Sequence, residues 1–193
     1  MSTNIATYIS PEEYLDRERA AETRSEWIDG EIREMVGGSH RHSTIAWNIA
    51  GELRRLLKGR PFSAHQSDMR VRIPDGPYYY PDVTVAPDPP ELEDDRKDTL
   101  LNPRLIFEVL SPSTEAIDQG TKLDNYRSIS TLTDYLLVAQ DTPRIDHYHR
   151  REDAWRLEII MEPAASLHLP EIGCELPLAE IYDRVVSTES DAV

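Results

Sequence analysis

Apolar residues recur at helical spacing in several stretches of the chain. The first follows the capping-box sequence Ser10-Pro11-Glu12-Glu13 and predicts a helix that extends to about Glu22. The second spans about Thr44 to Lys58, has one apolar face and ends at a glycine. The third spans about Glu115 to Ser128, and a shorter closing helix is expected between Leu176 and Arg184.

Runs of β-branched and aliphatic residues between these helices predict strands. Asp29-Gly30, flanked by apolar segments, predicts a hairpin within Glu26–Val36. Phe62–Ile73 alternates loosely and predicts one strand, whereas Tyr80–Ala86 and Arg104–Ser111 predict two buried strands. A meander of three strands is expected after the third helix, in Tyr135–Ala139, Arg144–His149 and Trp155–Met161.

The order of these elements is typical of the α/β class, because strands and helices alternate along the chain. The segment between the two buried strands, Pro87 to Asn102, is acidic and rich in proline, which is typical of an exposed loop. At 193 residues the chain is most simply one domain spanning residues 1–193, and a disordered tail is expected from about residue 186.

Each of the two buried strands carries one carboxylate in an apolar setting. Asp82 lies in the first, and Glu108 lies in the second on the same face as Ile106 and Leu110. An ionised carboxylate in such a place is unfavourable unless a cation or strong hydrogen-bond donors compensate it. Adjacent strands would bring the two acids together, and Mg²⁺ or Mn²⁺ would relieve their repulsion.

The net charge of −15 argues against a general nucleic-acid binder, which is normally basic. Residues 1–72 contain 11 basic and 11 acidic residues, so the remainder carries the entire excess. We interpret the basic residues of the first part either as a local basic groove or as separate surface charges: Arg54, Arg55, Lys58, Arg60, Arg70 and Arg72. No apolar run approaches membrane-spanning length, and the single cysteine, Cys174, fits a reducing cytoplasm.

Lys122 lies in the predicted third helix, which follows the Glu108 strand directly. Such a helix returns across the end of the sheet, so Lys122 can reach the two acids; an exposed ion pair with Asp118 is the alternative. Two acidic metal ligands, with a lysine beside a metal-activated water, are the groups that phosphodiester hydrolysis requires. His40 and His42 precede the second helix, where we interpret them as polar loop or cap residues.

Pro81-Asp82, Glu108-Val109-Leu110, Ser111-Pro112-Ser113-Thr114 and Lys122 follow one another in an order that resembles the PD-(D/E)XK nuclease superfamily. More closely, the chain is similar to a bacterial family of restriction-endonuclease-like proteins, from Ser10 to about Trp155. The superfamily motif places a lysine two residues after the glutamate, where this chain has Leu110. In the closer family the lysine has moved to the following helix, which matches Lys122.

The resemblance implies an α/β restriction-endonuclease-like core, with a central mixed β-sheet flanked by α-helices. It implies that Asp82 and Glu108 are catalytic ligands of Mg²⁺ or Mn²⁺, that the Val109 carbonyl is a third ligand, and that Lys122 positions the water. Glu26 matches an acidic residue that the superfamily often contributes as an outer metal or water ligand. A surface carboxylate at the edge of the hairpin is the alternative for Glu26.

These observations lead us to expect a cytoplasmic, Mg²⁺-dependent DNA endonuclease that has no membrane partner. A homodimer would allow its two active sites to act on the two strands of a DNA duplex. Two alternatives stay open: a catalytically inactive nuclease-fold binding module, and a nuclease that acts on RNA. The net charge of −15 and the displaced lysine favour the module. The intact carboxylate pair favours the enzyme, since an inactive site would have no reason to retain two buried acids.

Overall fold

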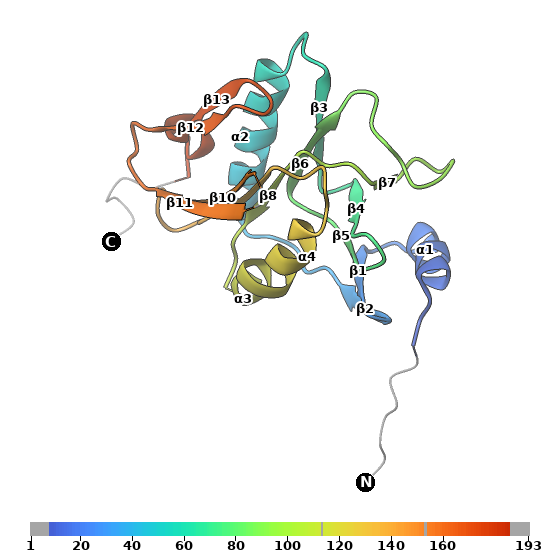
Figure 1. Ribbon diagram of the computed structural model, residues 1–193. Coiled ribbons are helices and arrows are strands. Elements are labelled where there is room, and N and C mark those ends of the chain that lie inside the picture. Colours follow the sequence, from blue (N-terminus) through green and yellow to red (C-terminus); the bar gives the residue numbers. More distant parts are fainter. Residues whose placement is uncertain (1–7, 113, 153, 186–193) are drawn as a thin grey trace, which may run out of the picture.

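The computed structural model describes residues 8–112, 114–152 and 154–185, and these build a six-stranded sheet, a five-stranded sheet and a two-stranded hairpin (Figure 1). The expected disordered tail from residue 186 lies outside the described residues. Within them, the central sheet has six strands in the order β11-β10-β9-β8-β6-β3. These are β3 (Phe62–Gln66), β6 (Val83–Pro87), β8 (Leu105–Val109), β9 (Asp134–Val138), β10 (Ile145–Arg151) and β11 (Ala154–Ile160). Only β8 and β9 pair in parallel here, so the sheet is mixed, as expected.

A second sheet has the strand order β2-β1-β5-β4-β7. Its strands are β1 (Ser25–Ile28), β2 (Glu31–Glu34), β4 (Arg70–Arg72), β5 (Tyr78–Tyr79) and β7 (Thr99–Leu100). The helical segments are α1 (Pro11–Ala20), α2 (His40–Leu56), α3 (Glu115–Ile117), a π-helical turn η1 (Asp118–Lys122), α4 (Leu123–Arg127) and α5 (Leu178–Ile181). A separate hairpin joins β12 (Ser166–Leu169) to β13 (Cys174–Pro177).

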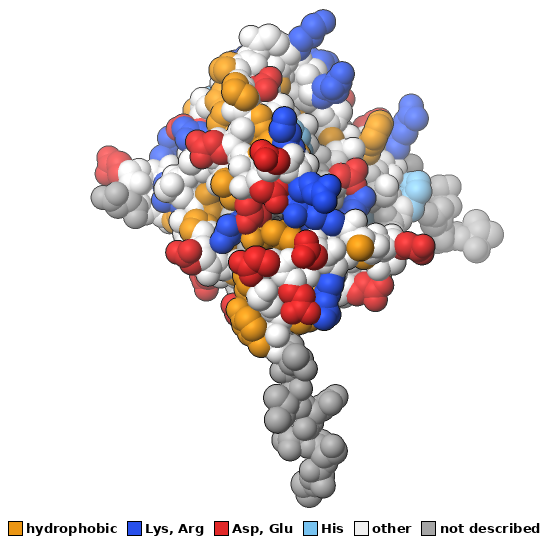
Figure 2. Space-filling model, turned by 90° about the vertical axis from the view of Figure 1, so that its right-hand side faces the viewer, with side chains coloured by type: hydrophobic (Ala, Val, Ile, Leu, Met, Phe, Trp, Pro, Cys, Tyr) orange, Lys and Arg blue, Asp and Glu red, His pale blue; other side chains and the backbone are white. Residues whose placement is uncertain are grey.

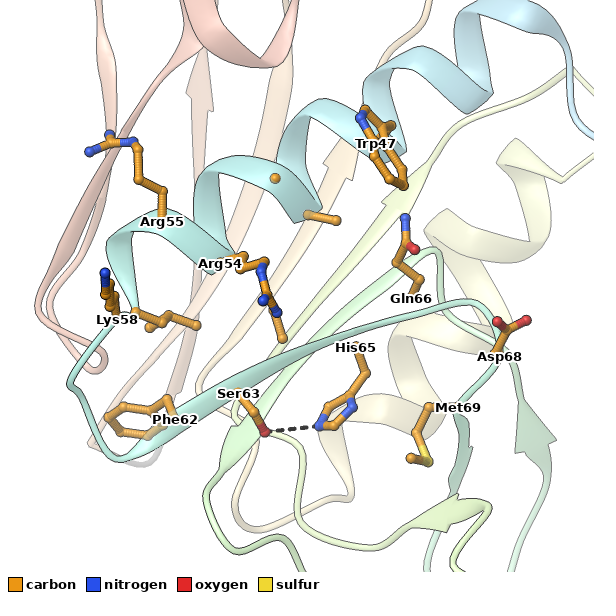
Figure 3. A pocket seen from close by; sticks show the side chains of 14 residues that line it. Trp47, Arg54, Arg55, Lys58, Phe62, Ser63, His65, Gln66, Asp68 and Met69 are labelled. Carbon is orange, nitrogen blue, oxygen red and sulfur yellow. Dashed lines mark hydrogen bonds between the residues drawn. The ribbon is translucent and has the colours of Figure 1, made fainter.

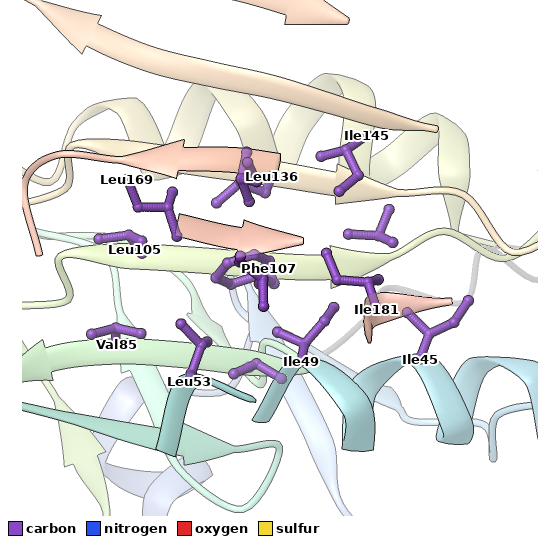
Figure 4. Packing of buried hydrophobic residues seen from close by; sticks show 14 of the residues in the cluster. Ile45, Ile49, Leu53, Val85, Leu105, Phe107, Leu136, Ile145, Leu169 and Ile181 are labelled. Carbon is purple, nitrogen blue, oxygen red and sulfur yellow. The ribbon is translucent and has the colours of Figure 1, made fainter. Parts of the chain in front are cut away.

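One face of the central sheet packs against α2, α5 and the β12–β13 hairpin (Figure 4). Ile45, Ile49 and Leu53 of α2 are fully buried there, at the helical spacing that the sequence predicted. They meet Leu105 and Phe107 of β8. The opposite face packs against α4 and the five-stranded sheet through residues such as Ile106. Strand β8 therefore alternates between two apolar layers, and Glu108 lies on the Ile106 side, as expected.

The local signals at the amino-terminal end are confirmed. Ser10 caps α1 by accepting a hydrogen bond from the Glu13 amide at 3.2 Å. The hairpin turns at Asp29-Gly30, where both residues have positive φ angles of 51° and 91°. This is the backbone twist that a two-residue hairpin requires, and Asp-Gly adopts it readily. The three-stranded meander β9-β10-β11 is also present.

Two of the predicted strands are longer than the strands in the structure. Phe62–Ile73 is split by a turn, closed by a 3.0 Å hydrogen bond from the Met69 amide to the Gln66 carbonyl, so that β3 and β4 enter different sheets. In Tyr80–Ala86 the strand begins only at Val83, because Pro81 has no N–H for the ladder. The second helix, in contrast, starts one turn earlier than predicted, at His40, with Ser39 as its cap.

The acidic segment Pro87–Asn102 is not simply an exposed loop, because strand pairing and ion pairs bind it to the rest of the protein. It contributes β7 to the second sheet, and its carboxylates bind arginines of the amino-terminal half. Asp98 contacts Arg19 at 2.9 Å and the buried Arg70 at 2.7 Å, and Arg19 leads in holding the pKa of Asp98 well below its usual range. Figure 2 shows acidic and basic side chains next to one another across one face. No helix in the described parts of the chain is long and apolar enough to span a membrane.

Gly51 in α2 and Gly59 after it have different backbone conformations, which substitution by alanine can test. Gly51 lies exposed in the middle of the helix, where an added Cβ meets no atom within 4 Å. We expect Gly51→Ala to stabilise the protein by about 1 kcal/mol, because alanine loses less conformational entropy in a helix. Gly59 has a φ of 78°, so Gly59→Ala should destabilise the protein by about 1 kcal/mol. Urea unfolding monitored by circular dichroism would measure both changes in the free energy of unfolding. Two changes of the same sign would contradict the backbone conformations described for Gly51 and Gly59.

Candidate functional site

The pairing of β6 with β8 brings Asp82 and Glu108 together. Val83 pairs with Phe107 in this antiparallel ladder, so the next pair outward is Asp82 and Glu108. Residues directly opposite each other have Cβ atoms about 5 Å apart. The Val109 amide donates a 2.7 Å hydrogen bond to Oδ2 of Asp82, which fixes the carboxylate against the end of β8. The structure thus places the two acids next to each other, although Asp82 lies just before its strand.

Lys122 reaches Glu108 from the helical segment that follows β8. Its Nζ lies 3.3 Å from Oε1 of Glu108 and 3.5 Å from Oδ1 of Asp118. Lys122 and Asp118 are both buried, so the alternative of an exposed surface pair is wrong. The turn between them is π-helical, a form that occurs mostly as single turns and frequently at functional sites.

Glu26 joins the same cluster from the five-stranded sheet. Its Oε1 lies 3.0 Å from Nζ of Lys122 and accepts a 3.3 Å hydrogen bond from the Tyr80 amide. The side chain of Glu26 is 14% exposed, so it is not a surface carboxylate at the edge of the hairpin. Tyr126 completes the surroundings by donating a 3.2 Å hydrogen bond to Oε1 of Glu108. The cluster is therefore assembled from both sheets and from the helix between them.

Burial dominates the electrostatics of these groups. It raises the pKa of Glu108 well above its ordinary value, while the ammonium of Lys122 opposes that rise. Burial likewise raises the pKa of Asp118. For Lys122, burial alone would lower the pKa, but attraction by Glu108, Glu26 and Asp118 outweighs it and raises the pKa. Attraction by these acids therefore favours the protonated form of Lys122, which donates hydrogen bonds.

His42 is a member of the site that our sequence interpretation missed. Its Nε2 lies 3.2 Å from Oδ2 of Asp82, and this hydrogen bond is the main reason that the pKa of His42 is raised. We interpreted His40 and His42 as loop or cap residues, whereas both belong to the first turn of α2. The available signal was Ser39, which caps the helix and so places His42 three residues inside it. Asp118 and Tyr126 were also not predicted as members of the site.

The donor set fits a hard divalent cation held by two carboxylates. In the described part of the chain, Oδ1 of Asp82 and Oε2 of Glu108 accept no hydrogen bond, whereas their partner oxygens do. No group of three or more His, Cys, Asp or Glu residues is arranged as a metal cage among the described residues. Mg²⁺ is commonly bound by one or two carboxylates and several waters, so a site of this kind does not need such a cage.

Only part of the expected basic groove exists. Arg70 is 2% exposed and bound to Asp98, and Arg72 is paired with Glu93 at 2.5 Å. The Arg60 guanidinium donates to the carbonyls of Leu56 and Ile172. These three arginines have structural partners, which leaves Arg54, Arg55 and Lys58 on α2 and its end as the candidates for a basic surface.

Replacing Lys122 with methionine tests the charge balance of the cluster. The variant keeps the length of the side chain but leaves Glu108 without its cation, so the pKa of that carboxyl should rise further. A carboxyl that binds its proton more tightly when folded loses stability as the pH rises through its folded pKa. We expect Lys122→Met to be destabilised by about 3–5 kcal/mol at pH 8 and by less at pH 5. Urea unfolding at both values would measure this, with the exposed Lys58→Met as the matched control.

Two curated proteins of the cyanobacterium Synechocystis sp. are similar to this chain over most of their length. The uncharacterized protein slr1290 is 38% identical over 177 residues, which cover 90% of this chain and 91% of slr1290. The uncharacterized protein sll1609 is 37% identical over 157 residues, which cover 80% of this chain and 89% of sll1609. Both alignments are long enough to include most of the fold.

The structure is similar to a crystal structure described as "a putative nuclease belonging to DUF820" from Anabaena variabilis. The TM-score is 0.70 at 19% sequence identity, over 86% of this chain and 93% of that one, so the likeness concerns the fold. The sequence profile of the family named Uma2, with the description "Putative restriction endonuclease", matches residues 11–179 and therefore spans every residue of the carboxylate–lysine cluster. This chain belongs to the Uma2 family, with a fold of the PD-(D/E)XK nuclease type.

Proposed function

We propose that this protein is a metal-dependent endonuclease that hydrolyses phosphodiester bonds of DNA. One observation carries the proposal: three acids from separate segments of the chain, Glu26, Asp82 and Glu108, lie in one cluster. The buried cation Lys122 contacts Glu26 and Glu108, and Asp82 is bound to the backbone next to Glu108. A buried ion pair is not needed for stability, since well-packed apolar residues often serve as well or better. Family membership supports the same reaction class.

In this proposal Asp82, Glu108 and the Val109 carbonyl hold Mg²⁺ or Mn²⁺. The ion, when bound, supplies an activated water and neutralises charge that develops on the phosphate oxygens. His42 and the Val109 amide both bind Oδ2 of Asp82 and so fix the orientation of this carboxylate, whose other oxygen would be left to hold the ion. Glu26 accepts from Lys122 and holds the ammonium group at the edge of the site.

Lys122 acts as a donor in this scheme. Attraction by Glu108, Glu26 and Asp118 raises its pKa against the effect of burial and so favours the protonated form, which donates hydrogen bonds. A fixed ammonium group in a site with little water can orient the attacking water and stabilise the negative charge of the transition state. The proton of the water is then accepted elsewhere, by a phosphate oxygen or by solvent.

The second candidate is a binding module that has kept the fold without the activity. The net charge of −15 favours it, because a nuclease must approach a polyanion. Both candidates predict a folded cluster, but only the enzyme requires the two carboxylates to bind a metal ion. RNA as the substrate and a homodimer as the active form stay predictions, as does the cytoplasmic location.

Cleavage of plasmid DNA tests the catalytic assignment. Wild-type protein should nick plasmid in the presence of Mg²⁺ and not in the presence of a chelator. Asp82→Asn and Glu108→Gln should each reduce the rate at least about 100-fold, since each removes a charge that acts in the transition state. Glu158→Gln, which alters an exposed carboxylate on β11, is the matched control and should cut at the wild-type rate. A wild-type protein that cleaves neither DNA nor RNA would overturn the proposal.

Calorimetric titration with Mn²⁺ separates the enzyme from the module. We expect the wild-type protein and the Glu158→Ala control to take up Mn²⁺, and we expect Asp82→Ala and Glu108→Ala to lose the binding heat. Each of the two replacements removes a hard oxygen ligand that water alone cannot replace. A wild-type protein that binds no Mn²⁺ while remaining folded would support the module.

A further inference from the structure

A groove with a volume of about 980 Å³ runs between α2 and β3. Strand β3 is at the edge of the central sheet, opposite to the edge formed by β11. Figure 3 shows Trp47 and Arg54 directed from α2 towards β3, whereas Arg55, which also lines the groove, extends from the other side of the helix. The volume is at the upper limit of small-molecule sites, which is suitable for an extended ligand.

One stripe of α2 lines this groove. Trp47, Gly51, Arg54 and Lys58 occur at positions i, i+4, i+7 and i+11, which lie on one side of a helix and its carboxyl-terminal turn. Gly51 leaves open space between the indole and the first cation, because an added Cβ would meet no atom within 4 Å. The stripe is therefore a hollow surface with an aromatic side chain at one end and cations at the other.

Trp47, Arg54 and Lys58 have no structural partners among the described residues that would explain them. The Trp47 side chain is 68% exposed and makes no ring contact with any described residue. The side chains of Arg54 and Lys58 form no ion pair or hydrogen bond within the described part of the chain. Arg55, in contrast, is held by Glu52 at 2.8 Å. The groove is thus locally cationic in a protein whose net charge is −15.

The aromatic end of the groove lies beside the proposed active centre. Gln66, which lines the groove, pairs with Val83 in the β3–β6 ladder, and the next residue is Asp82. Trp47 is five residues after His42 on α2, a rise of about 7.5 Å along the helix axis, and His42 contacts Asp82. The groove thus approaches the His42–Asp82 contact from the α2 face of the sheet, whereas Glu108 lies on the opposite face.

We propose that this groove binds an unpaired strand of DNA, with a base stacked on Trp47 and phosphates bound by Arg54 and Lys58. An exposed indole combined with a cationic track is the usual means of binding single strands without reading their sequence. In a duplex both faces of each base are covered by its neighbours, so an indole can stack only on a base that has left the helix. The inference rests on the proposed nuclease function and specifies its substrate as single-stranded or locally unpaired DNA.

Binding measured without metal tests the groove separately from cleavage. In the presence of a chelator, wild-type protein should bind a fluorescently labelled single-stranded oligonucleotide at least tenfold more tightly than the same sequence as a duplex. Trp47→Ala should weaken binding to the single strand about tenfold, and Trp47→Phe should restore most of it. For the double variant Arg54→Gln/Lys58→Gln, the slope of log K against the logarithm of the salt concentration should become less steep by about 1.4. This is the change expected when two phosphate contacts are lost.

One control and one further variant make the test specific. Arg156→Gln removes an exposed cation from β11, at the far edge of the sheet, and should leave the single-strand affinity unchanged. Gly51→Leu should fill the hollow between Trp47 and Arg54 and weaken binding without a change of charge. Circular dichroism would establish that every variant is folded.

The outcomes separate the two proposals. If Trp47→Ala binds the single strand as the wild-type protein does, or if the duplex binds equally well, the groove assignment is wrong whether or not the protein cleaves DNA. If the single strand binds in the groove but Mg²⁺ brings no cleavage, the groove assignment stands and the nuclease proposal fails. Groove-dependent binding together with Mg²⁺-dependent cleavage of the single strand would support both.

Discussion

The ammonium group of Lys122 makes the central polar contact between the two sheets, inside the apolar layer that joins them. It lies within ion-pair distance of Glu26 from one sheet, of Glu108 from the other, and of Asp118 in its own helical turn. Each of these acids would be unfavourable without a cation, since they are removed from water. One buried cation thus contacts three acids but balances a single negative charge, and burial still raises the pKa values of Glu108 and Asp118. The effects of replacing these residues are therefore not expected to be additive.

Much of the fold could be predicted because its signals are local. The cap at Ser10, the Asp29-Gly30 turn and the apolar face of α2 each result from interactions between residues close in the chain. The alternation around Glu108 was likewise predictable, because period two decides which face of β8 each side chain enters. What the pattern could not reveal was the second sheet, since its short strands are defined by pairing with distant segments.

The site was predictable to the extent that its members occur in recognisable strands and motifs. Asp82, Glu108, Lys122 and Glu26 do converge, although their roles are proposals. His42 was missed because a helix that begins one turn earlier changes a loop histidine into one that faces Asp82. Arg70 and Arg72 were assigned to a basic groove because sequence cannot show which carboxylates will approach them; here Asp98 and Glu93 do so.

The π-helical turn Asp118–Lys122 sets the orientation of the helix that follows it. Its hydrogen bonds skip one residue more than those of an α-helix, so residues after it are offset by about 100° from where an uninterrupted helix would place them. Deletion of one residue from this turn would therefore rotate α4 and carry Tyr126 away from Glu108, while the strands that carry both acids stay unaltered.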